Sequence, residues 1–432
     1  MFVIPAVALL VLLLLQFRHG FVWFGARLID PNYVIVALAI VILFGAWRLV
    51  SVIQAFLIGV SRPERLKVDR VALGILVGVI LVSHLGATFL LAVDFQAASN
   101  IFKPGGPLVD LSTPMPSATP TLAPNETPQP TDATTPGPPT ITSRVTILFN
   151  GVDATTGVGD RGNQILYDSD LVVSYDPDTN SLQMISVPRD AASLPYYFKM
   201  SAPRTKLNTI PTNVKAGYIK SPDAPYTTLL KEISYLVGLP INYYAVMDFT
   251  GFIKMIDTVG GIDVTNAAAI DDPTYDWLDN VHFGFKLAAG LQHLDGKNAL
   301  AYVRSRHSAG DNDFGRSARQ QEVLIDLLRK MAEPDQIVNF PSLIETLGAS
   351  VTTNFPADKV ADFVAIGQSI PKDKISQVVL DPSDRYSRYF TIPGGGASSG
   401  VCLDNSALAQ LSIKLFGADS TWNGKTPPPQ TC

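Results

Sequence analysis

Three long apolar stretches near the amino terminus limit what this chain can fold into more than any other feature of its sequence. They run from Met1 to Leu15, from Tyr33 to Val60 and from Val71 to Val93. A helix needs about 20 predominantly apolar residues to cross a bilayer. The first stretch is close to the lower limit, but no basic residue precedes it, which disfavours a signal peptide. The sequence therefore predicts a three-helix transmembrane anchor over residues 1–94.

The charges between the second and third stretches predict the orientation of this anchor. Residues 61–70 contain four basic side chains, whereas the longer first loop has only Arg18 and Arg27. Because positively charged loops stay on the cytoplasmic side, residues 61–70 are expected inside the cell and everything after Val93 outside. We expect a multi-pass protein of the cell membrane whose C-terminal domain is extracytoplasmic.

A change in composition marks the next segment. Residues 103–142 are rich in Pro, Thr, Ser and Ala and contain no aromatic side chain. Such a segment cannot bury enough apolar surface to offset the entropy lost on ordering. We therefore predict an extracytoplasmic linker over residues 95–143, a globular domain over residues 144–331 and a C-terminal extension, packed on that domain or following it, over residues 332–432.

Strand and helix patterns alternate in the globular region, which predicts an α/β fold. Residues 145–150 are apolar enough for a buried strand. Residues 171–175 and 181–187 flank an Asp-Pro-Asp-Thr-Asn turn, which is typical of a β-hairpin. Helical periodicity follows at residues 227–237, 250–259, 295–303 and, most clearly, 314–331.

The predicted hairpin brings acidic and basic residues together at one end of the sheet. Because its strands are antiparallel, Asp170 at the start of one lies beside Arg189 after the end of the next. Asp153 follows the strand at residues 145–150, which is expected to be a neighbour. Carboxylate oxygens suit Mg²⁺ or Mn²⁺, and such an ion can bridge to phosphate oxygens. The sequence therefore indicates a site in which carboxylates hold a metal ion next to an anionic ligand.

A second group of charges surrounds the start of the last predicted helix. Arg304 and Arg306 follow the preceding helix, and Asp313 stands at the start of the long one. Arg316 and Gln320 are four residues apart, so they share one face of that helix. The free N–H groups of a helix start and the guanidinium group of arginine both favour phosphate. These residues predict a phosphate-binding site.

Several other kinds of site lack their motif. The sequence has no Walker A loop, no GxSxG elbow and no zinc-type spacing of Cys and His. A net charge of −5 at pH 7 provides no basic field for nucleic acid, so no nucleic-acid partner is expected. Cys402 and Cys432 are the only cysteines, and outside the cell they can form a disulfide, with two free thiols as the alternative.

Seven segments, taken in order, resemble the LytR-CpsA-Psr family. They are GVD (151–153), SD (169–170), SVPRD (186–190), KLN (206–208), DFTGFIKMIDTVGGIDV (248–264), LDGKNALAYVRSR (294–306) and DFGRSARQQ (313–321). The resemblance covers residues 144–331 and implies an α/β/α fold, with a mixed central sheet flanked by helices. It also implies a membrane-anchored extracytoplasmic enzyme. Such an enzyme transfers a glycopolymer from a polyprenyl-pyrophosphate carrier to peptidoglycan or another wall acceptor, forming a phosphodiester with Mg²⁺ or Mn²⁺.

The resemblance also implies roles for individual residues. By position, Asp153 and Asp170 resemble metal ligands, and Asp313 resembles an acidic partner that orients or activates other groups. The residues that resemble a pyrophosphate clamp are Arg189, Arg304, Arg306, Arg316 and Gln320. The catalytic residues that it implies are Asp153, Asp170, Arg189, Asp313 and Arg316.

One position departs from the pattern of the family. The chain has Asp168-Ser169-Asp170 where the family typically has Arg-Ser-Asp. The additional carboxylate can strengthen metal binding, but the phosphate site has one cation fewer. We hypothesise that Arg161, in the preceding Gly-rich loop, takes the place of the missing arginine. The alternative is a non-catalytic protein that binds polyprenyl phosphate or regulates the cell envelope.

Overall fold

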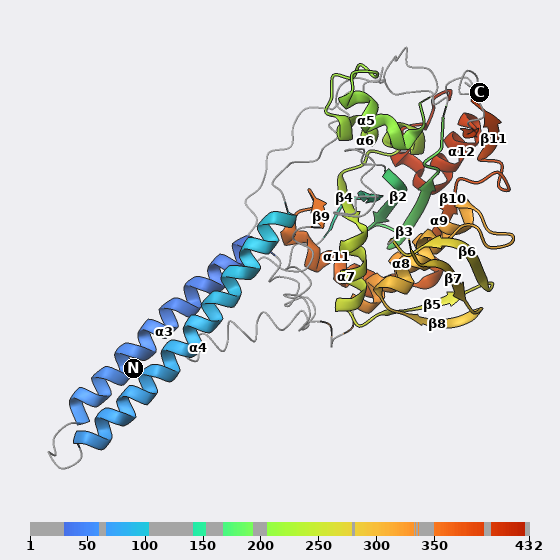
Figure 1. Cartoon of the computed structure of the whole chain (residues 1–432). Helices are drawn as coiled ribbons and strands as arrows, with labels where there is room; N and C mark the ends of the chain where they lie inside the picture. Colours follow the sequence, from blue (N-terminus) through green and yellow to red (C-terminus); the bar gives the residue numbers. More distant parts are fainter. Residues whose placement is uncertain are drawn as a thin grey trace, which may run out of the picture.

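The computed structural model describes residues 30–59, 66–102, 141–152, 167–192, 205–278, 281–331, 350–392 and 399–427, together with residues 333 and 336. A central β-sheet carries helices on both of its faces, and two long helices extend away from this globular part (Figure 1). The α/β fold with a mixed central sheet flanked by helices is therefore confirmed.

The central sheet has six strands in the order β10-β3-β2-β1-β4-β9. Strand β2 pairs antiparallel with β1 and β3, and β4 pairs antiparallel with β9. Strands β1 and β4, and likewise β10 and β3, are parallel, so the sheet is mixed. The bounds are β1 Val145–Val152, β2 Tyr167–Asp176, β3 Ser181–Val187, β4 Tyr243–Asp248, β9 Val351–Thr353 and β10 Ile375–Val379.

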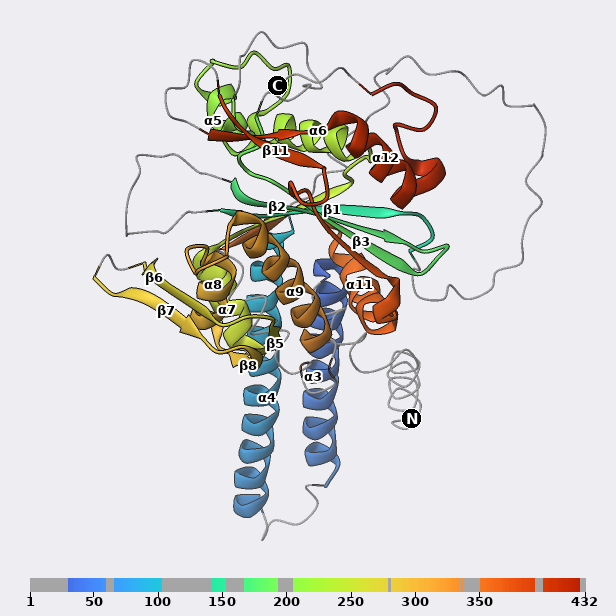
Figure 2. The same cartoon turned by 90° about the vertical axis from the view of Figure 1, so that its right-hand side faces the viewer.

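Alternate side chains of these strands enter different cores, because successive residues of a strand point to opposite faces. Leu148 and Val172 join a core with α5 (Ile210–Lys215), α6 (Pro225–Val237) and α12 (Asn405–Phe416). Ile147 and Val173 pack on the opposite face, which is covered by α7 (Phe249–Thr258), α8 (Gly296–Arg304), α9 (Asp313–Met331) and α11 (Ala357–Ser369) (Figure 2). The sheet is thus buried on both faces.

The predicted hairpin and helices lie where the sequence placed them, with small shifts at their ends. Strand β2 begins at Tyr167, before the predicted residue 171, so Asp168 and Asp170 belong to the strand. Aspartates stand at the amino ends of α7 and α8, where Asp248 and Asp295 accept backbone N–H hydrogen bonds. Helix α6 ends at Gly238, whose φ of 68° suits a residue without a side chain.

Short elements complete the domain. Two-stranded sheets join β5 (Ile262–Asn266) to β8 (Gly290–Leu294), β6 (Ile270–Asp276) to β7 (Phe283–Leu287) and β11 (Ser387–Thr391) to β12 (Ser399–Leu403). Short 3-10 helices lie at Leu207–Thr209, Lys372–Lys374 and Gly417–Asp419. Strands β9 and β10 and helices α11 and α12 all lie in the predicted C-terminal extension, so this extension supplies both edges of the central sheet.

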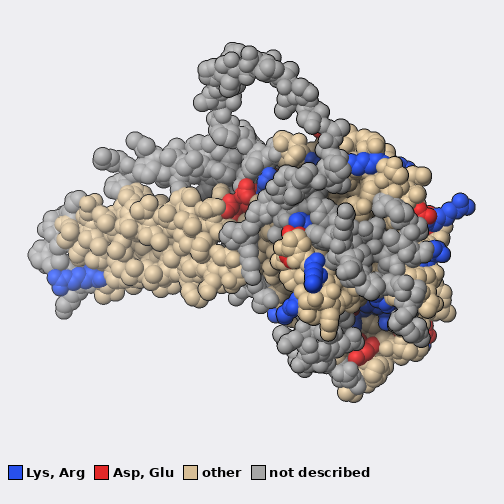
Figure 3. Space-filling model, turned by 90° about the horizontal axis from the view of Figure 1, so that it is seen from above, with Lys and Arg blue, Asp and Glu red and all other residues tan. Residues whose placement is uncertain are grey.

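Helices α3 (Pro31–Gly59) and α4 (Leu66–Ile101) form an antiparallel pair beside the domain. Within the described residues, two helices are long and apolar enough to cross a membrane, Pro31–Leu57 and Arg70–Ile101. Their surface carries few charged side chains (Figure 3). These helices suggest membrane anchoring. The third predicted span, Met1–Leu15, lies outside the described residues.

The carboxyl-terminal end of α4 is part of the domain core. Ala98 is fully buried, and Ile101 nearly so, in a cluster that includes Phe249 and Met255. Phe102 forms a parallel β-bridge with Thr353 of β9. Asp94, where the apolar stretch ends, lies seven residues before Ile101, which corresponds to about 10 Å along a helix. Helix α4 therefore continues beyond residue 94, and its last turns pack against the domain.

Replacing Phe102 and Thr353 with cysteine tests this contact. Bridge partners lie within the Cα separation that a disulfide can span, so Phe102→Cys/Thr353→Cys should cross-link after oxidation in membranes. A protease site inserted between residues 103 and 140 makes the bond visible, because the two fragments then stay together in non-reducing electrophoresis. The control pair is Phe102→Cys/Tyr218→Cys, since Tyr218 is 79% exposed and remote from α4. Fragments that separate in both variants would contradict the docked arrangement.

Candidate functional site

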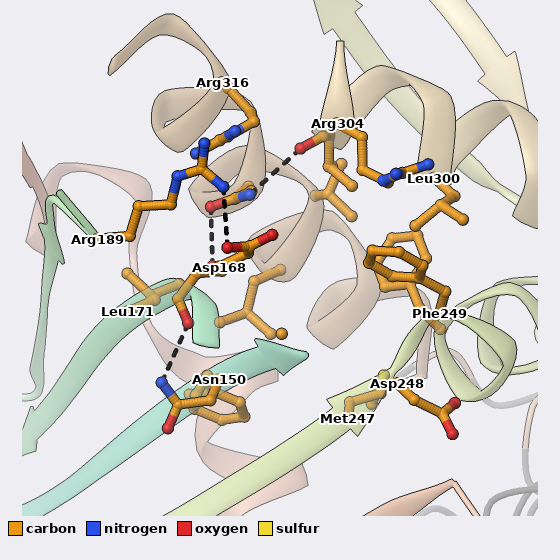
Figure 4. Close-up of a pocket in the computed structure, with 18 of the residues that line it drawn as sticks. Asn150, Asp168, Leu171, Arg189, Met247, Asp248, Phe249, Leu300, Arg304 and Arg316 are labelled. Carbon is orange, nitrogen blue, oxygen red and sulfur yellow. Dashed lines mark hydrogen bonds and ion pairs between the residues drawn. The ribbon is translucent and has the colours of Figure 1, made fainter. Parts of the chain in front are cut away.

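A cavity of about 560 Å³ lies between the central sheet and helices α7, α8 and α9. One part is polar and is lined by Asp168, Arg189, Lys206, Arg304, Arg306, Arg316 and Gln320. The other part is apolar and is lined by Phe149, Leu171, Met247, Phe249, Phe252, Met255, Leu300, Val323 and Leu327. Figure 4 shows Arg189 and Arg316 near Asp168, with Arg304 farther along the cavity beside Phe249. The cavity is therefore amphiphilic along its length.

The register of β2 in the sheet brings Asp168 and Asp170 close to Arg189. Asp170 lies opposite Asn150 of β1 and opposite Val187 of β3. The chain leaves β3 at Val187, so Arg189 reaches back beside the start of β2. Its Nη1 atom lies 2.8 Å from Oδ1 of Asp168. The predicted proximity of Arg189 to the start of this strand is present in the structure.

Asp313 is the carboxylate around which the arginines gather. Its Oδ1 atom lies 3.0 Å from Nη1 of Arg316, 3.4 Å from Nη1 of Arg306 and 4.0 Å from Nη2 of Arg189. Burial acts to raise the pKa of Asp313, but the three nearby arginines outweigh burial and lower it. The ionised carboxylate holds together cations that would otherwise repel one another.

Arg316 is the most enclosed of these cations. Burial lowers its pKa to about 10, so it remains charged at neutral pH. Its Nε atom is buried without a hydrogen-bond partner among the described residues. An unpaired buried donor costs about 1–3 kcal/mol. An anion that reached this donor would remove that cost, which favours a ligand such as phosphate.

Gln320 connects three elements at the polar part of the cavity. Its Oε1 atom accepts a hydrogen bond of 2.8 Å from Oγ of Ser169, and its Nε2 atom donates one of 3.2 Å to the carbonyl of Val303. These bonds join β2, α8 and α9. Gln320 and Arg316 share the face of α9 that lines the cavity, as the sequence indicates.

Arg304 lines the cavity but lies apart from the cluster around Asp313. Its guanidinium carbon lies 4.4 Å from the ring centre of Phe249 and 5.6 Å from that of Tyr275. Such cation–π contacts contribute about 0.5–2 kcal/mol. Arg304 therefore stands between the polar and apolar parts, and in this structure it is stacked on rings rather than grouped with the other arginines.

Asp170 is a buried carboxylate with one unpaired oxygen among the described residues. It is 3% exposed, and its Oδ1 atom accepts a hydrogen bond of 2.6 Å from Nδ2 of Asn150. Its Oδ2 atom has no hydrogen-bond partner among the described residues. Burial raises the pKa of Asp170 to about 8. A cation beside Oδ2 would satisfy the unpaired oxygen and favour the ionised form, so this carboxylate fits a cation.

The rest of the predicted metal site is less complete. Asp153 lies outside the described residues. Within the described residues, no group of three or more His, Cys, Asp or Glu side chains is arranged to hold a metal ion. Asp168, the unusual carboxylate, pairs with Arg189 instead. Arg161 also lies outside the described residues.

Asp272 of β6 is a residue of the site that the sequence did not single out. It is almost fully buried and accepts hydrogen bonds from Oγ of Ser305 at 2.9 Å and from the backbone N–H groups of Arg306 at 3.1 Å and His307 at 3.2 Å. It thereby holds the turn that carries Arg304 and Arg306. In the sequence Asp272 stands in an Asp-Asp-Pro run, which reads as an ordinary turn or cap and gives no signal of such a role.

Arg319 supports the same turn from α9. Its Nε atom donates a hydrogen bond of 2.8 Å to the carbonyl of Tyr302, and its Nη2 atom donates to the carbonyl of Ser305. Asp311 pairs with Nη2 at 2.9 Å. The motif at residues 313–321 therefore contains one arginine for the cavity, Arg316, and one that supports its wall.

Replacing Asp272 with asparagine tests the turn. Burial acts to raise the pKa of Asp272, but hydrogen bonds from Thr274, Ser305 and two backbone N–H groups lower it from 3.8 to about 2. Because the folded pKa is depressed, the stabilisation is present above about pH 4 and is lost as pH falls toward 2. It corresponds to about 2 kcal/mol.

The measurement is urea unfolding of the full chain in detergent between pH 7 and pH 2. We expect Asp272→Asn to be less stable than the wild type at neutral pH and to lack this acid-dependent loss. Asp271→Asn is the matched control, because Asp271 is exposed and pairs with the exposed Lys286. Equal behaviour of the two variants would show that Asp272 does not hold the turn.

Similarity to known proteins is consistent with this geometry. The chain is 30% identical over 240 residues to the polyisoprenyl-teichoic acid–peptidoglycan teichoic acid transferase TagV of Bacillus subtilis (strain 168), which covers 56% of this chain and 57% of TagV. It is 34% identical over 223 residues to the regulatory protein MsrR of Staphylococcus aureus (strain COL), which covers 51% of this chain and 59% of MsrR. The chain thus spans somewhat more than half the length of these two relatives.

A solved structure and a family model extend the comparison. The crystal structure of protein gbs0355 from Streptococcus agalactiae has a TM-score of 0.52 at 20% sequence identity, and the match covers 67% of this chain and 92% of that one. At this identity the likeness shows a shared fold only. The model of the LytR_cpsA_psr family matches residues 119–396, well over half of the chain. The protein therefore belongs to the LytR_cpsA_psr family, as the ordered motifs indicated.

Proposed function

We propose that the protein transfers a glycopolymer from a polyprenyl-pyrophosphate carrier to peptidoglycan or another wall acceptor, forming a phosphodiester. The observation that carries this proposal is the amphiphilic cavity beside the outer end of α4, with arginines in one part and apolar side chains in the other. A lipid pyrophosphate has the same division between charge and hydrocarbon. The name of the relative TagV describes a transfer of this kind.

The apolar part of the cavity suits the prenyl chain. Met247, Phe249 and Phe252 line it from β4 and α7, and Val323 and Leu327 line it from α9. Burying each CH₂ group contributes about 0.8 kcal/mol. The same side of the domain receives Ala98 and Ile101 of α4. A chain could therefore pass from the membrane into the cavity over a short distance.

The polar part suits the pyrophosphate. Guanidinium groups bind phosphate oxygens in pairs of hydrogen bonds, and Arg189, Arg306 and Arg316 lie around one point. Phosphoryl transfer depends mainly on positioning and on stabilising charge that develops on phosphate oxygens. Because Asp313 fixes the arginines beforehand, little reorganisation is needed when the donor binds. This cluster would carry most of the electrostatic contribution to the reaction.

The cofactor is proposed to be Mg²⁺ or Mn²⁺, held by Asp170 together with Asp153. The unpaired buried oxygen of Asp170 supports this assignment. When bound, the ion would neutralise charge on the phosphoryl oxygens. Asp168 would compete with the donor for Arg189, and Arg161 is proposed to supply the compensating charge.

The membrane topology is proposed to have three spans, with Met1–Leu15 added to the two described helices. Under this arrangement residues 61–70 lie in the cytoplasm and the domain lies outside the cell, because the basic loop stays inside. The donor and the wall acceptor would then both be on the side of the domain.

Two arginines of the same helix allow a matched test of the cluster. Arg316→Ala should lower kcat for transfer of a polyprenyl-pyrophosphate-linked glycan to peptidoglycan by about 100- to 1,000-fold, as expected when a preorganised cation is lost. Arg329→Ala, near the other end of α9 and paired with Asp326, is the control and should retain activity. An active Arg316→Ala enzyme would exclude the clamp.

Arg161→Ala in the same assay tests whether Arg161 supplies the charge that compensates for Asp168. Full activity of this variant would exclude that role.

Metal binding can be measured directly, without an assay of transfer activity. Electron paramagnetic resonance of Mn²⁺ titrated into the purified full chain should show a bound population in the wild type, and Asp170→Asn should lose it. Asp223→Asn is the control, because Asp223 pairs with Lys231 outside the cavity. Chelation by EDTA should abolish transfer, and Mg²⁺ should restore it. Unchanged Mn²⁺ binding in Asp170→Asn would exclude this residue as a ligand.

A second candidate is a non-catalytic protein that binds polyprenyl phosphate or regulates the cell envelope. It is favoured by Asp168, which occupies Arg189 with an ion pair of 2.8 Å, and by the name of the relative MsrR, a regulatory protein. The two candidates differ in one result. Tight binding of farnesyl pyrophosphate without any transfer, in Mg²⁺ or Mn²⁺, would support the second.

A further inference from the structure

A second, smaller cavity of about 90 Å³ adjoins the first one at the arginines. Both cavities are lined by Asp168, Arg189, Arg316 and Gln320. The larger cavity continues from these residues toward β1 and β4, whereas the smaller one continues toward the end of β3 and the hairpin β11–β12. In the sheet β2 lies between β1 and β3. The two cavities therefore approach the same polar residues from different sides.

The hairpin is attached firmly beside the arginines. The N–H group of Val401 donates to the carbonyl of Asp190 at 2.9 Å, and the N–H group of Ala192 donates to the carbonyl of Val401 at 3.0 Å. Residues 191 and 401 form a parallel bridge. The neighbouring Cys402 is buried and disulfide-bonded, while Cys432 lies outside the described residues. The C-terminal extension thus supplies one wall of the smaller cavity.

The smaller cavity combines a polar floor with an aromatic rim. Asp170, whose Oδ2 atom lacks a hydrogen-bond partner among the described residues, lines this cavity but not the larger one. Tyr389 of β11 lines it as well, is 61% exposed, and has its ring centre 5.9 Å from that of Phe314. The two rings meet edge to face, at an interplanar angle of 64°, so Phe314 holds the tyrosine ring in place while most of Tyr389 stays exposed. A polar group can enter the cavity while a larger ligand lies on the ring.

We propose that the smaller cavity receives the hydroxyl arm of the acceptor sugar and that Tyr389 carries the sugar ring. This rests on the proposed transfer function. In phosphoryl transfer the attacking and leaving oxygens lie roughly in line on opposite sides of phosphorus. With the prenyl phosphate in the larger cavity and the phosphoryl group at the arginines, the attacking hydroxyl must come from the other side.

The reaction then balances as follows. The bond between the acceptor oxygen and the glycan-bearing phosphorus forms, and the bond from that phosphorus to the oxygen of the prenyl phosphate breaks. Prenyl monophosphate leaves into the larger cavity, and the hydroxyl proton passes to water. The volume of about 90 Å³ restricts entry to a short arm, so the ring stays outside on Tyr389. Tyr389 is thus a specificity residue for the acceptor rather than a catalytic one.

The test separates acceptor binding from donor binding. With a peptidoglycan glycan-strand fragment as acceptor, Tyr389→Ala should raise KM for the acceptor about tenfold, with the effect on the acceptor KM rather than on kcat or on the donor KM. Tyr389→Phe, which keeps the ring, should recover most of the lost affinity. Tyr218→Ala is the matched control, because Tyr218 is an exposed tyrosine that follows α5 and lines neither cavity.

Two results would overturn the proposal. One is an acceptor KM in Tyr389→Ala equal to that of the wild type, and the other is an increase in the donor KM alone, which would assign the hairpin to the donor. If the wild type transfers no glycan, the proposed function fails separately. Direct binding of the same fragment to the full chain, measured by isothermal titration calorimetry, then decides whether Tyr389→Ala weakens glycan binding.

Discussion

The antiparallel pairing of β2 with β1 and β3 is the constraint on which the candidate site depends. Its register places Asp170 opposite Asn150 and Val187, so the chain leaving β3 returns to the start of β2. A slip of one residue would turn every side chain of β2 to the other face of the sheet. Arg189 then could not lie 2.8 Å from Asp168, and the oxygen of Asp170 would leave the smaller cavity.

Carboxylates make a concentration of arginines possible next to this strand. Asp313 lies within 4.0 Å of Arg189, Arg306 and Arg316, and Asp168 pairs with Arg189 as well. Asp272 fixes the backbone of the turn that carries Arg306. Cations that are already fixed and only partly neutralised can stabilise a developing phosphate charge without rearranging. Asp168 adds a further anion to this group of charges.

Two segments far apart in the sequence, α4 and the hairpin β11–β12, border the site on different sides. On one side Ala98 and Ile101 of α4 pack into the core next to the apolar part of the larger cavity. On another side the hairpin β11–β12 closes the smaller cavity through Val401. The two cavities thus reach the same arginines from different sides. The contact between α4 and the domain is a tertiary feature that the composition of residues 103–142 does not predict.

Features that repeat locally, or that follow one another in order along the chain, could be predicted from the sequence. Apolar length predicted α3 and α4, the turn residues predicted the hairpin of β2 and β3, and the spacing of Val323, Leu324 and Leu327 predicted the buried face of α9. The ordered motifs indicated the family. These signals are local because burial imposes the period of a helix or strand on neighbouring residues.

Contacts between residues far apart in the sequence became known from the folded structure. It placed Arg304 on Phe249, Asp272 under the turn at Ser305, β9 and β10 at the edges of the sheet, and Tyr389 beside Phe314. The sequence contains no pattern for such contacts, because they join segments far apart along the chain and depend on strand order and packing. The residues of the polar cluster could therefore be named from the motifs, while their supports and the second cavity could not.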